Sequence, residues 1–231
     1  IRNGYSVEKG GGMYNDRCSP TVTNSTFTQS TAEFGGGMGN TYSSPSVSRC
    51  VFVGNAALES GGGLCNFMYC SPTVTNCTFM ENLANVSGGG GGMYNYYSST
   101  PSIVNCTFVD NRAAVGDGIY NHTASPLVTN CILWGPSTSH DVSHIYNTGT
   151  CTPVVTYSCV QGGYDGTGNI SSDPLLLGTI GSNGRIQPDS PCIDAGTTAG
   201  APATDMVGVV RPQGGVVDMG AYELDDSDGD G

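Results

Sequence analysis

Apolar and polar positions repeat along the first 160 or so residues of the chain. One apolar residue, usually placed after a run of glycines, returns at intervals of 25, 26, 29, 26 and 26 residues. It is found at Met13, Met38, Leu64, Met93, Ile119 and Ile145. A unit that returns at a nearly constant period of this length predicts a stacked repeat architecture.

A second pattern lies between the glycine runs and keeps the same period. Its form is Ser/Thr-Pro-x-Val-x-Asn-Cys-x-Phe, as in SPTVTNCTF at residues 71–79. Its two apolar positions are held by Val22, Val47, Val74, Ile103 and Val128, and by Phe27, Phe52, Phe79, Phe108 and Leu133. Alternation of apolar and polar residues is typical of half-buried strands. Val74 and Phe79 break that alternation between them, so we expect a corner near Asn76.

These two patterns predict three short strands in each repeat, separated by turns. Identical positions of successive coils would then stack about 4.8 Å apart along one axis. A leucine-rich repeat has a similar period but needs several leucines in each unit, which these repeats lack. The sequence therefore predicts a three-sided β-solenoid.

Asparagines occupy two positions of the repeat, and stacking would place them in files. The longer file contains Asn15, Asn40, Asn66, Asn95, Asn121 and Asn147, and the shorter one contains Asn24, Asn76, Asn105 and Asn130. Asparagine tolerates sharp turns, and its amide can bond the amides above and below it. We interpret both files as asparagine ladders.

Composition supports an all-β chain. Glycine contributes 36 of the 231 residues, charged residues make up only 11%, and helix-forming residues are scarce. The net charge of −12, with seven lysines and arginines in total, excludes a basic surface for nucleic acid. No apolar run reaches the roughly 18 residues of a membrane-spanning helix, so no transmembrane segment is expected.

Residues 1–165 resemble the right-handed parallel β-helix proteins of the pectate-lyase-like group. The glycine runs, combined with Phe52-x-x-Asn55, Phe79-x-x-Asn82 and Phe108-x-x-Asn111, are also similar to the repeats of polymorphic outer-membrane adhesins. The resemblance implies an all-β, right-handed parallel β-helix of about six or more coils.

The repeat is lost in residues 166–224, which contain SPCIDAG and DMGAYEL. This segment resembles the C-terminal module of bacterial secreted β-helix proteins, which implies a β-rich closing module and a location that is secreted or at the cell surface. Residues 225–231 begin an acidic linker. There, Asp226, Asp228 and Asp230 have the spacing of the first ligands of a calcium loop, so calcium is the one cofactor predicted. A solvated linker is the alternative.

Three tyrosines follow the inward apolar residue on consecutive coils, namely Tyr94, Tyr120 and Tyr146. We expect them to point outward as a stripe that contacts carbohydrate or another subunit, with cross-strand stabilisation as the alternative. Glycosylation sequons occur in both asparagine files, but Asn85 and Asn169 lie in insertions and are the sites expected to accept a glycan.

The ten cysteines divide into two sets. Cys50, Cys77, Cys106 and Cys131 align in successive coils, where we expect a stack of buried free thiols. Any disulfides should come from the second set, which contains Cys18, Cys65, Cys70, Cys151, Cys159 and Cys192.

No set of residues assembles an evident active site. Glu81 and Asp110 fall at equivalent places on neighbouring coils, but two carboxylates without further partners are more typical of ordinary turns. We therefore expect an extracellular structural or adhesive solenoid, and catalysis is less favoured. Because the chain opens directly on repeat sequence, copies of itself in a head-to-tail filament are one predicted partner. The alternative function is a β-helix that binds or degrades polysaccharide, as a lyase or hydrolase.

Overall fold

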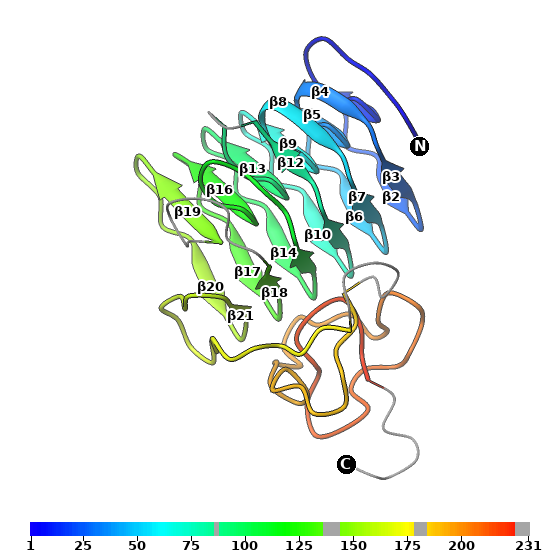
Figure 1. The fold of residues 1–231 in the computed structure, drawn as a ribbon, viewed down its shortest axis with the longest axis vertical. Coiled ribbons are helices and arrows are strands. Elements are labelled where there is room, and N and C mark those ends of the chain that lie inside the picture. Colours follow the sequence, from blue (N-terminus) through cyan, green and yellow to red (C-terminus); the bar gives the residue numbers. More distant parts are fainter. Residues whose placement is uncertain (86–87, 136–143, 178–183, 225–231) are drawn as a thin grey trace.

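The computed structural model describes residues 1–85, 88–135, 144–177 and 184–224, which form a parallel β-solenoid with a C-terminal segment beside it (Figure 1). Three sheets of six parallel strands run along the solenoid. The first contains β1 (Met13–Asp16), β5 (Met38–Thr41), β9 (Leu64–Phe67), β13 (Met93–Tyr96), β16 (Ile119–His122) and β19 (Ile145–Thr148). The second contains β2 (Thr21–Thr23), β6 (Ser46–Ser48), β10 (Thr73–Thr75), β14 (Ser102–Val104), β17 (Leu127–Thr129) and β20 (Val154–Thr156).

The third sheet contains β3 (Thr26–Thr28), β7 (Val51–Val53), β11 (Thr78–Met80), β15 (Thr107–Val109), β18 (Ile132–Trp134) and β21 (Cys159–Val160). These are the three predicted sides, stacked at six levels. A short fourth sheet, which was not predicted, joins β4 (Thr31–Phe34), β8 (Ala56–Ser60) and β12 (Leu83–Ala84). Residues before β1 extend the same stacking, since Tyr5 bridges Thr31 and Lys9 bridges Phe34.

The predicted core residues fill the inside of the coils. Four phenylalanine rings stack in one column, with ring centroids 4.8, 4.7 and 4.5 Å apart and planes within 5° of parallel. They are Phe27, Phe52, Phe79 and Phe108. These centroid distances match the distance between adjacent strands, so in-register pairing itself produces the stacking. The other predicted apolar positions belong to the same cluster, except that Met13 is partly buried and packs against it.

The glycine runs are required by close backbone contacts between coils. A Cβ atom at Gly63 would lie 2.6 Å from the carbonyl oxygen of Gly92 and 2.9 Å from the ring of Phe79. Gly61 has a φ of +75°, a left-handed conformation that other residues adopt at an energetic cost. The first glycine of the run is therefore needed for the turn and the third for the space beneath the phenylalanine column.

The shorter asparagine file forms the predicted corner but is not an amide ladder. Asn24, Asn76, Asn105 and Asn130 have φ values of 48°, 49°, 48° and 53°, which turn the chain between the second and third sheets. Among the described contacts, one amide joins two of them, from Asn130 to Asn105 at 3.2 Å. Asn24 is exposed, and the amide of Asn76 donates to the carbonyl oxygen of Thr204. The left-handed backbone directs these amides away from the core, which is why the ladder prediction is wrong for this file.

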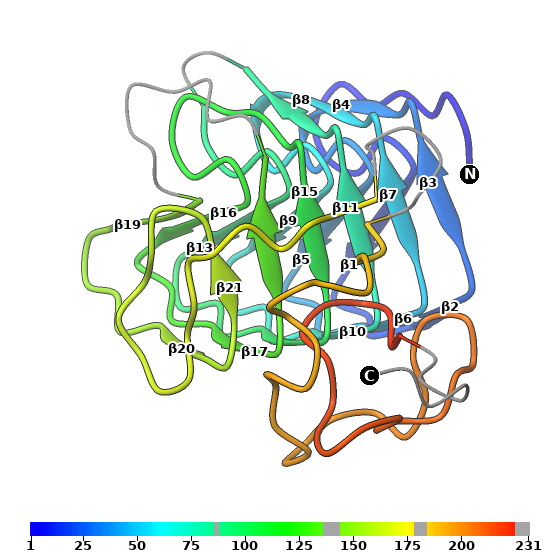
Figure 2. The ribbon, with the colours of Figure 1, turned by 60° about the horizontal axis from the view of Figure 1, so that its bottom comes forward.

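The C-terminal segment lies along the outer side of the solenoid (Figure 2). Its described residues, 166–177 and 184–224, form turns and isolated bridges such as Leu176↔Ile186, and contain none of the named strands. The expectation of a β-rich module is therefore not met. A second apolar cluster of Ile132, Cys159, Ile186, Cys192 and Met219 joins this segment to the outer face of the third sheet.

A buried charged network organises this segment. The guanidinium of Arg211 contacts the carboxylate of Glu223 at 2.6 Å, and both side chains are almost completely buried. Asp205 accepts the backbone N–H groups of Val207 and Glu223, along with two others. Burial raises the pKa of Asp218 to about 6, although its carboxylate accepts two backbone N–H bonds. Paired buried charges of this kind fix the path of a segment that contains little regular structure.

Candidate functional site: an exposed row of tyrosines

The longer asparagine file is a continuous ladder. Each side-chain amide donates to the side-chain oxygen of the asparagine on the next coil, over five bonds of 2.8 or 2.9 Å from Asn15 to Asn147. The last amide donates to the hydroxyl of Tyr164 at 3.0 Å. Because the ladder faces the interior, it holds the coils in register and offers no surface for a partner.

A second ladder replaces the one that was predicted wrongly. Asn55, Asn82 and Asn111 are buried, and the side-chain amides of Asn55 and Asn82 each donate to the side-chain oxygen of the next asparagine at 2.9 Å. The amides also donate to the carbonyl oxygens of Phe27, Phe52 and Phe79. The sequence signal for this ladder is the Phe-x-x-Asn motif, whose asparagines recur on three consecutive coils.

The predicted tyrosine stripe exists but is not a free surface. The rings of Tyr94 and Tyr120 are 5.0 Å apart, and those of Tyr120 and Tyr146 are 5.6 Å apart. Tyr94, however, is buried, and the other two are half-buried. The glycine-rich loop covers this face, since a Cβ atom at Gly89 would clash with the ring of Tyr120. Tyr94 alternates with the interior residues Met93 and Asn95 and so points outward as expected, but its ring packs against those of Tyr96 and Tyr120 and is not exposed.

A different row of tyrosines is exposed, at the edge where the first and second sheets meet. Tyr42, Tyr69 and Tyr97 follow β5, β9 and β13 and are 43%, 55% and 44% exposed. The ring centroids of Tyr42 and Tyr69 are 6.0 Å apart and nearly parallel, and those of Tyr69 and Tyr97 are 5.5 Å apart and nearly perpendicular. We call these three residues the tyrosine row.

The backbone of the tyrosine row is strained. Tyr42, Tyr69 and Tyr97 have φ values of 49°, 52° and 44°, in the left-handed region that glycine and asparagine favour. A bulky residue held there costs on the order of 1–3 kcal/mol. The flanking coils make the same left-handed turn with Arg17 and Thr123, so tyrosine occupies this position on the three coils between them.

Charged and aromatic groups flank the row. The guanidinium of Arg17 lies over the ring of Tyr42 at 5.4 Å from its centroid. On the adjacent face of the first sheet, the rings of Phe67 and Tyr96 are 4.8 Å apart, and the ammonium of Lys9 lies 4.5 Å from the Phe67 centroid. The row is hard to recognise in the sequence because its tyrosines follow the ladder asparagine by two or three residues, so their spacing varies slightly from repeat to repeat.

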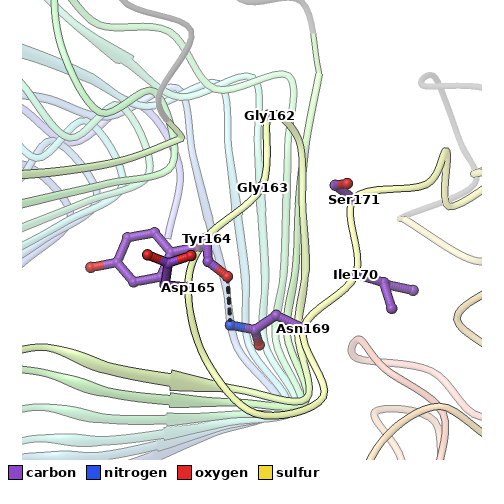
Figure 3. A pocket seen from close by; sticks show the side chains of 7 residues that line it. All are labelled: Gly162, Gly163, Tyr164, Asp165, Asn169, Ile170 and Ser171. Carbon is purple, nitrogen blue, oxygen red and sulfur yellow. Dashed lines mark hydrogen bonds between the residues drawn. The ribbon is translucent and has the colours of Figure 1, made fainter.

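A small open cavity of about 470 Å³ lies at the last coil, in the loop that follows β21 (Figure 3). Its lining includes Tyr164, Asp165 and Asn169. The amide of Asn169 donates to the carbonyl oxygens of Val155 and Tyr164, and its side-chain oxygen accepts the N–H of Ser158. Asn169 is half-buried and closes this loop, so a glycan on its amide nitrogen would have to replace both donated bonds. Asn169 is therefore less accessible than predicted, whereas Asn85 is exposed as expected.

The two carboxylates considered for catalysis lie at a different corner, between the third and fourth sheets. Glu81 and Asp110 both have left-handed backbones and occupy neighbouring coils. The pKa of Asp110 is raised by burial and then by the negative charge of Glu81. No group of three potential metal ligands occurs among the described residues. Asp226, Asp228 and Asp230 lie outside the described residues, so their binding of calcium stays a prediction.

All ten cysteines carry free thiols in this structure. Cys50, Cys77, Cys106 and Cys131 form the predicted buried stack, in which each sulfur contacts a backbone carbonyl of the preceding coil. This part of the prediction is confirmed.

Within the part of the chain that the structure describes, no helix is long and apolar enough to cross a membrane. No curated protein and no solved structure matches the chain. One family does match, described as a right-handed β-helix region, and its match extends over residues 2–162, nearly the same residues that form the observed solenoid. The chain therefore belongs to the right-handed β-helix family.

Proposed function

We propose that this protein is an adhesive solenoid that binds an extracellular polysaccharide along the tyrosine row. The observation that carries the proposal is the row itself: three exposed rings on consecutive coils, each held on a backbone that tyrosine adopts at a cost. Aromatic rings stack on the apolar faces of sugars, and a row with this repeat suits an extended polymer better than a single small ligand.

The charge of the chain favours an uncharged polysaccharide. With a net charge of −12, the protein repels acidic polymers at low ionic strength, whereas a neutral polymer is unaffected. A polysaccharide partner in turn implies action outside the cell or at its surface. The C-terminal segment leaves the row uncovered, because its hydrogen bonds to the solenoid start at the opposite edge of the second sheet, at Asn76 and Asn105.

Self-assembly into a head-to-tail filament is less well supported. Residues after β21 already cover part of the last level, since Val160 donates to the carbonyl oxygen of Ile170 and Tyr157 donates to that of Thr167. Those backbone groups are thus occupied and do not offer a free edge to another copy.

Degradation of polysaccharide is the second candidate, and the observation that favours it is the raised pKa of Asp110, which is caused by burial and then by the nearby charge of Glu81. Glycoside hydrolysis uses two carboxylates, one of which has a raised pKa. The pair lies at the edge between the third and fourth sheets, away from the tyrosine row, so a polymer bound along the row would not meet it. We therefore rank binding above catalysis.

Affinity electrophoresis in gels that contain a neutral glucan, a neutral xylan or polygalacturonate tests the proposal. We expect the neutral polymers to retard the protein, and a variant with Tyr42→Asn, Tyr69→Asn and Tyr97→Asn to migrate freely. Asparagine keeps the turns, and Tyr5→Asn is the matched control because Tyr5 is 72% exposed and lies outside the row. Equal retardation of the triple variant and the Tyr5→Asn control would disprove binding by the row. Release of shorter saccharides from the polymer would support degradation instead.

A further inference from the structure

We propose that Cys159 and Cys192 form a disulfide that ties the C-terminal segment to the last coil of the solenoid. Cys159 lies in β21, on the outer face of the third sheet, and Cys192 belongs to the segment that packs over that face. Both side chains are completely buried in the second apolar cluster. A bond between them would join two parts of the chain that otherwise meet only through packing and hydrogen bonds.

The two thiols are already neighbours. Their sulfur atoms are close enough to share a hydrogen bond. The sulfur of Cys159 also lies 3.3 Å from the carbonyl oxygen of Ser172, and the carbonyl oxygen of Cys192 accepts the N–H of Met219 at 3.0 Å. The sulfur of Cys159 and the backbone of Cys192 are thus each held by a contact within the C-terminal segment, on the same side of the third sheet.

Among the described contacts, none of the remaining cysteines of the second set makes a hydrogen bond to another thiol. Three of them occupy one file along the corner before the second sheet, where serine or alanine separates them. The order in that file is Cys18, Ser43, Cys70, Ser99, Ala124 and Cys151. Members two levels apart are about 9.6 Å distant, which exceeds the Cα separation of a disulfide. Cys65 stacks between Gly39 and Tyr94.

The buried stack is also a poor source of disulfides, although its thiols are adjacent. Side chains that project in the same direction from paired strands keep their Cβ atoms about 4.8 Å apart, whereas a disulfide needs about 3.5–4.5 Å. Of the possible pairs, Cys159 with Cys192 is therefore the one that packing brings together from different directions.

Disulfide formation removes two protons and two electrons from the two thiols. A small-molecule disulfide such as oxidised glutathione can accept them, and it is cleaved to two thiols as the protein disulfide forms. The Cys159 thiol contacts Cys192 and is buried, and both effects raise its pKa far above the usual range. The thiol is therefore unreactive once the segment has docked. The exchange therefore takes place before the C-terminal segment docks, and docking then shields the bond from reductants.

Tryptic mapping of the full chain tests the pair directly. Arg185 separates the two cysteines, and Cys192 is the last cysteine of the sequence, so it is alone on the C-terminal side of that cleavage. The protein is refolded in oxidised and reduced glutathione, denatured, alkylated and digested. We expect the peptide that contains Cys192 to remain joined to the peptide that contains Cys159, and to separate on reduction.

Two variants identify the partner within that peptide. The tryptic peptide that contains Cys159 also contains Cys131 and Cys151. Cys159→Ser should therefore release the Cys192 peptide, whereas Cys151→Ser should leave the two peptides joined. Oxidation should also raise the melting temperature of the wild-type protein by roughly 5–10 °C relative to the reduced form. Full alkylation of Cys192 in wild-type protein refolded in glutathione, or persistence of the link in Cys159→Ser, would overturn the proposal.

Discussion

Asn82 makes two hydrogen bonds to one oxygen atom of Asn111, from its backbone N–H at 3.1 Å and from its side-chain amide at 2.9 Å. The same amide also donates to the carbonyl oxygen of Phe52. In the longer ladder, by contrast, the side chain of Asn95 makes one bond to the coil on each side. The shorter ladder therefore ties both side chains and backbone together, beside the phenylalanine column.

Replacement of these asparagines should rank the two ladders. Asn95→Ala leaves one buried donor and one buried acceptor unpaired and should lower the free energy of unfolding by about 1–3 kcal/mol. Asn82→Ala also strands the backbone N–H of Asn55 and the carbonyl oxygen of Phe52, so we expect a larger loss. Urea denaturation of both variants measures the difference, and equal losses would show that the additional bonds contribute nothing.

The strain in the tyrosine row can be measured at a single position. Tyr97→Ala and Tyr97→Asn both remove the ring, but asparagine accepts the left-handed backbone more easily. The asparagine variant should therefore be more stable than the alanine variant by about 0.5–1 kcal/mol. At Tyr5, whose backbone is not left-handed, the same two substitutions should differ little. Thermal or urea unfolding of the four variants provides the comparison, and a similar difference at both positions would argue against strain.

The buried carboxylate of Asp218 should make stability depend on pH. Its pKa in the folded state, about 6, lies above the ordinary value of 3.8, so the folded protein holds this proton more tightly than the unfolded chain does. The resulting stabilisation is fully present below about pH 4 and is lost as pH rises through 6, in total about 3 kcal/mol.

Asp218→Asn should remove that dependence while leaving a constant offset, because the amide cannot accept the N–H of Leu224 as the carboxylate does. The informative quantity is the difference in unfolding free energy between wild type and variant from pH 4 to pH 8. A difference that stays constant over this range would contradict the raised pKa.

The thiol stack should resist oxidation. Each of Cys50, Cys77, Cys106 and Cys131 is completely buried, and strand pairing holds their Cβ atoms apart. We expect at least two of the four to remain free thiols after refolding in a glutathione buffer. Alkylation under denaturing conditions followed by mass spectrometry counts them, and the finding of all four in disulfides would contradict the packing argument.

Repetition explains which features could be predicted from the sequence. Val74, Phe79 and Asn95 recur at one period, and in-register stacking gives each of them the same environment at every level. The burial of Tyr94 could not be predicted in this way, because it depends on how its ring packs against the side chains of Tyr96 and Tyr120. The docking of Cys192 on the third sheet was equally hidden, since it joins a segment without repeats to the solenoid.

The placement of the C-terminal segment also bears on how such a protein changes length over evolutionary time. Among the described hydrogen bonds, those that join this segment to the coils begin at Asn76, on the third level. Gain or loss of a complete coil before that level would leave every one of these bonds intact and change the height of the molecule by about 4.8 Å. Coils before the third level can thus be gained by duplication without disturbing the docked segment, and each new coil offers one more position for a tyrosine.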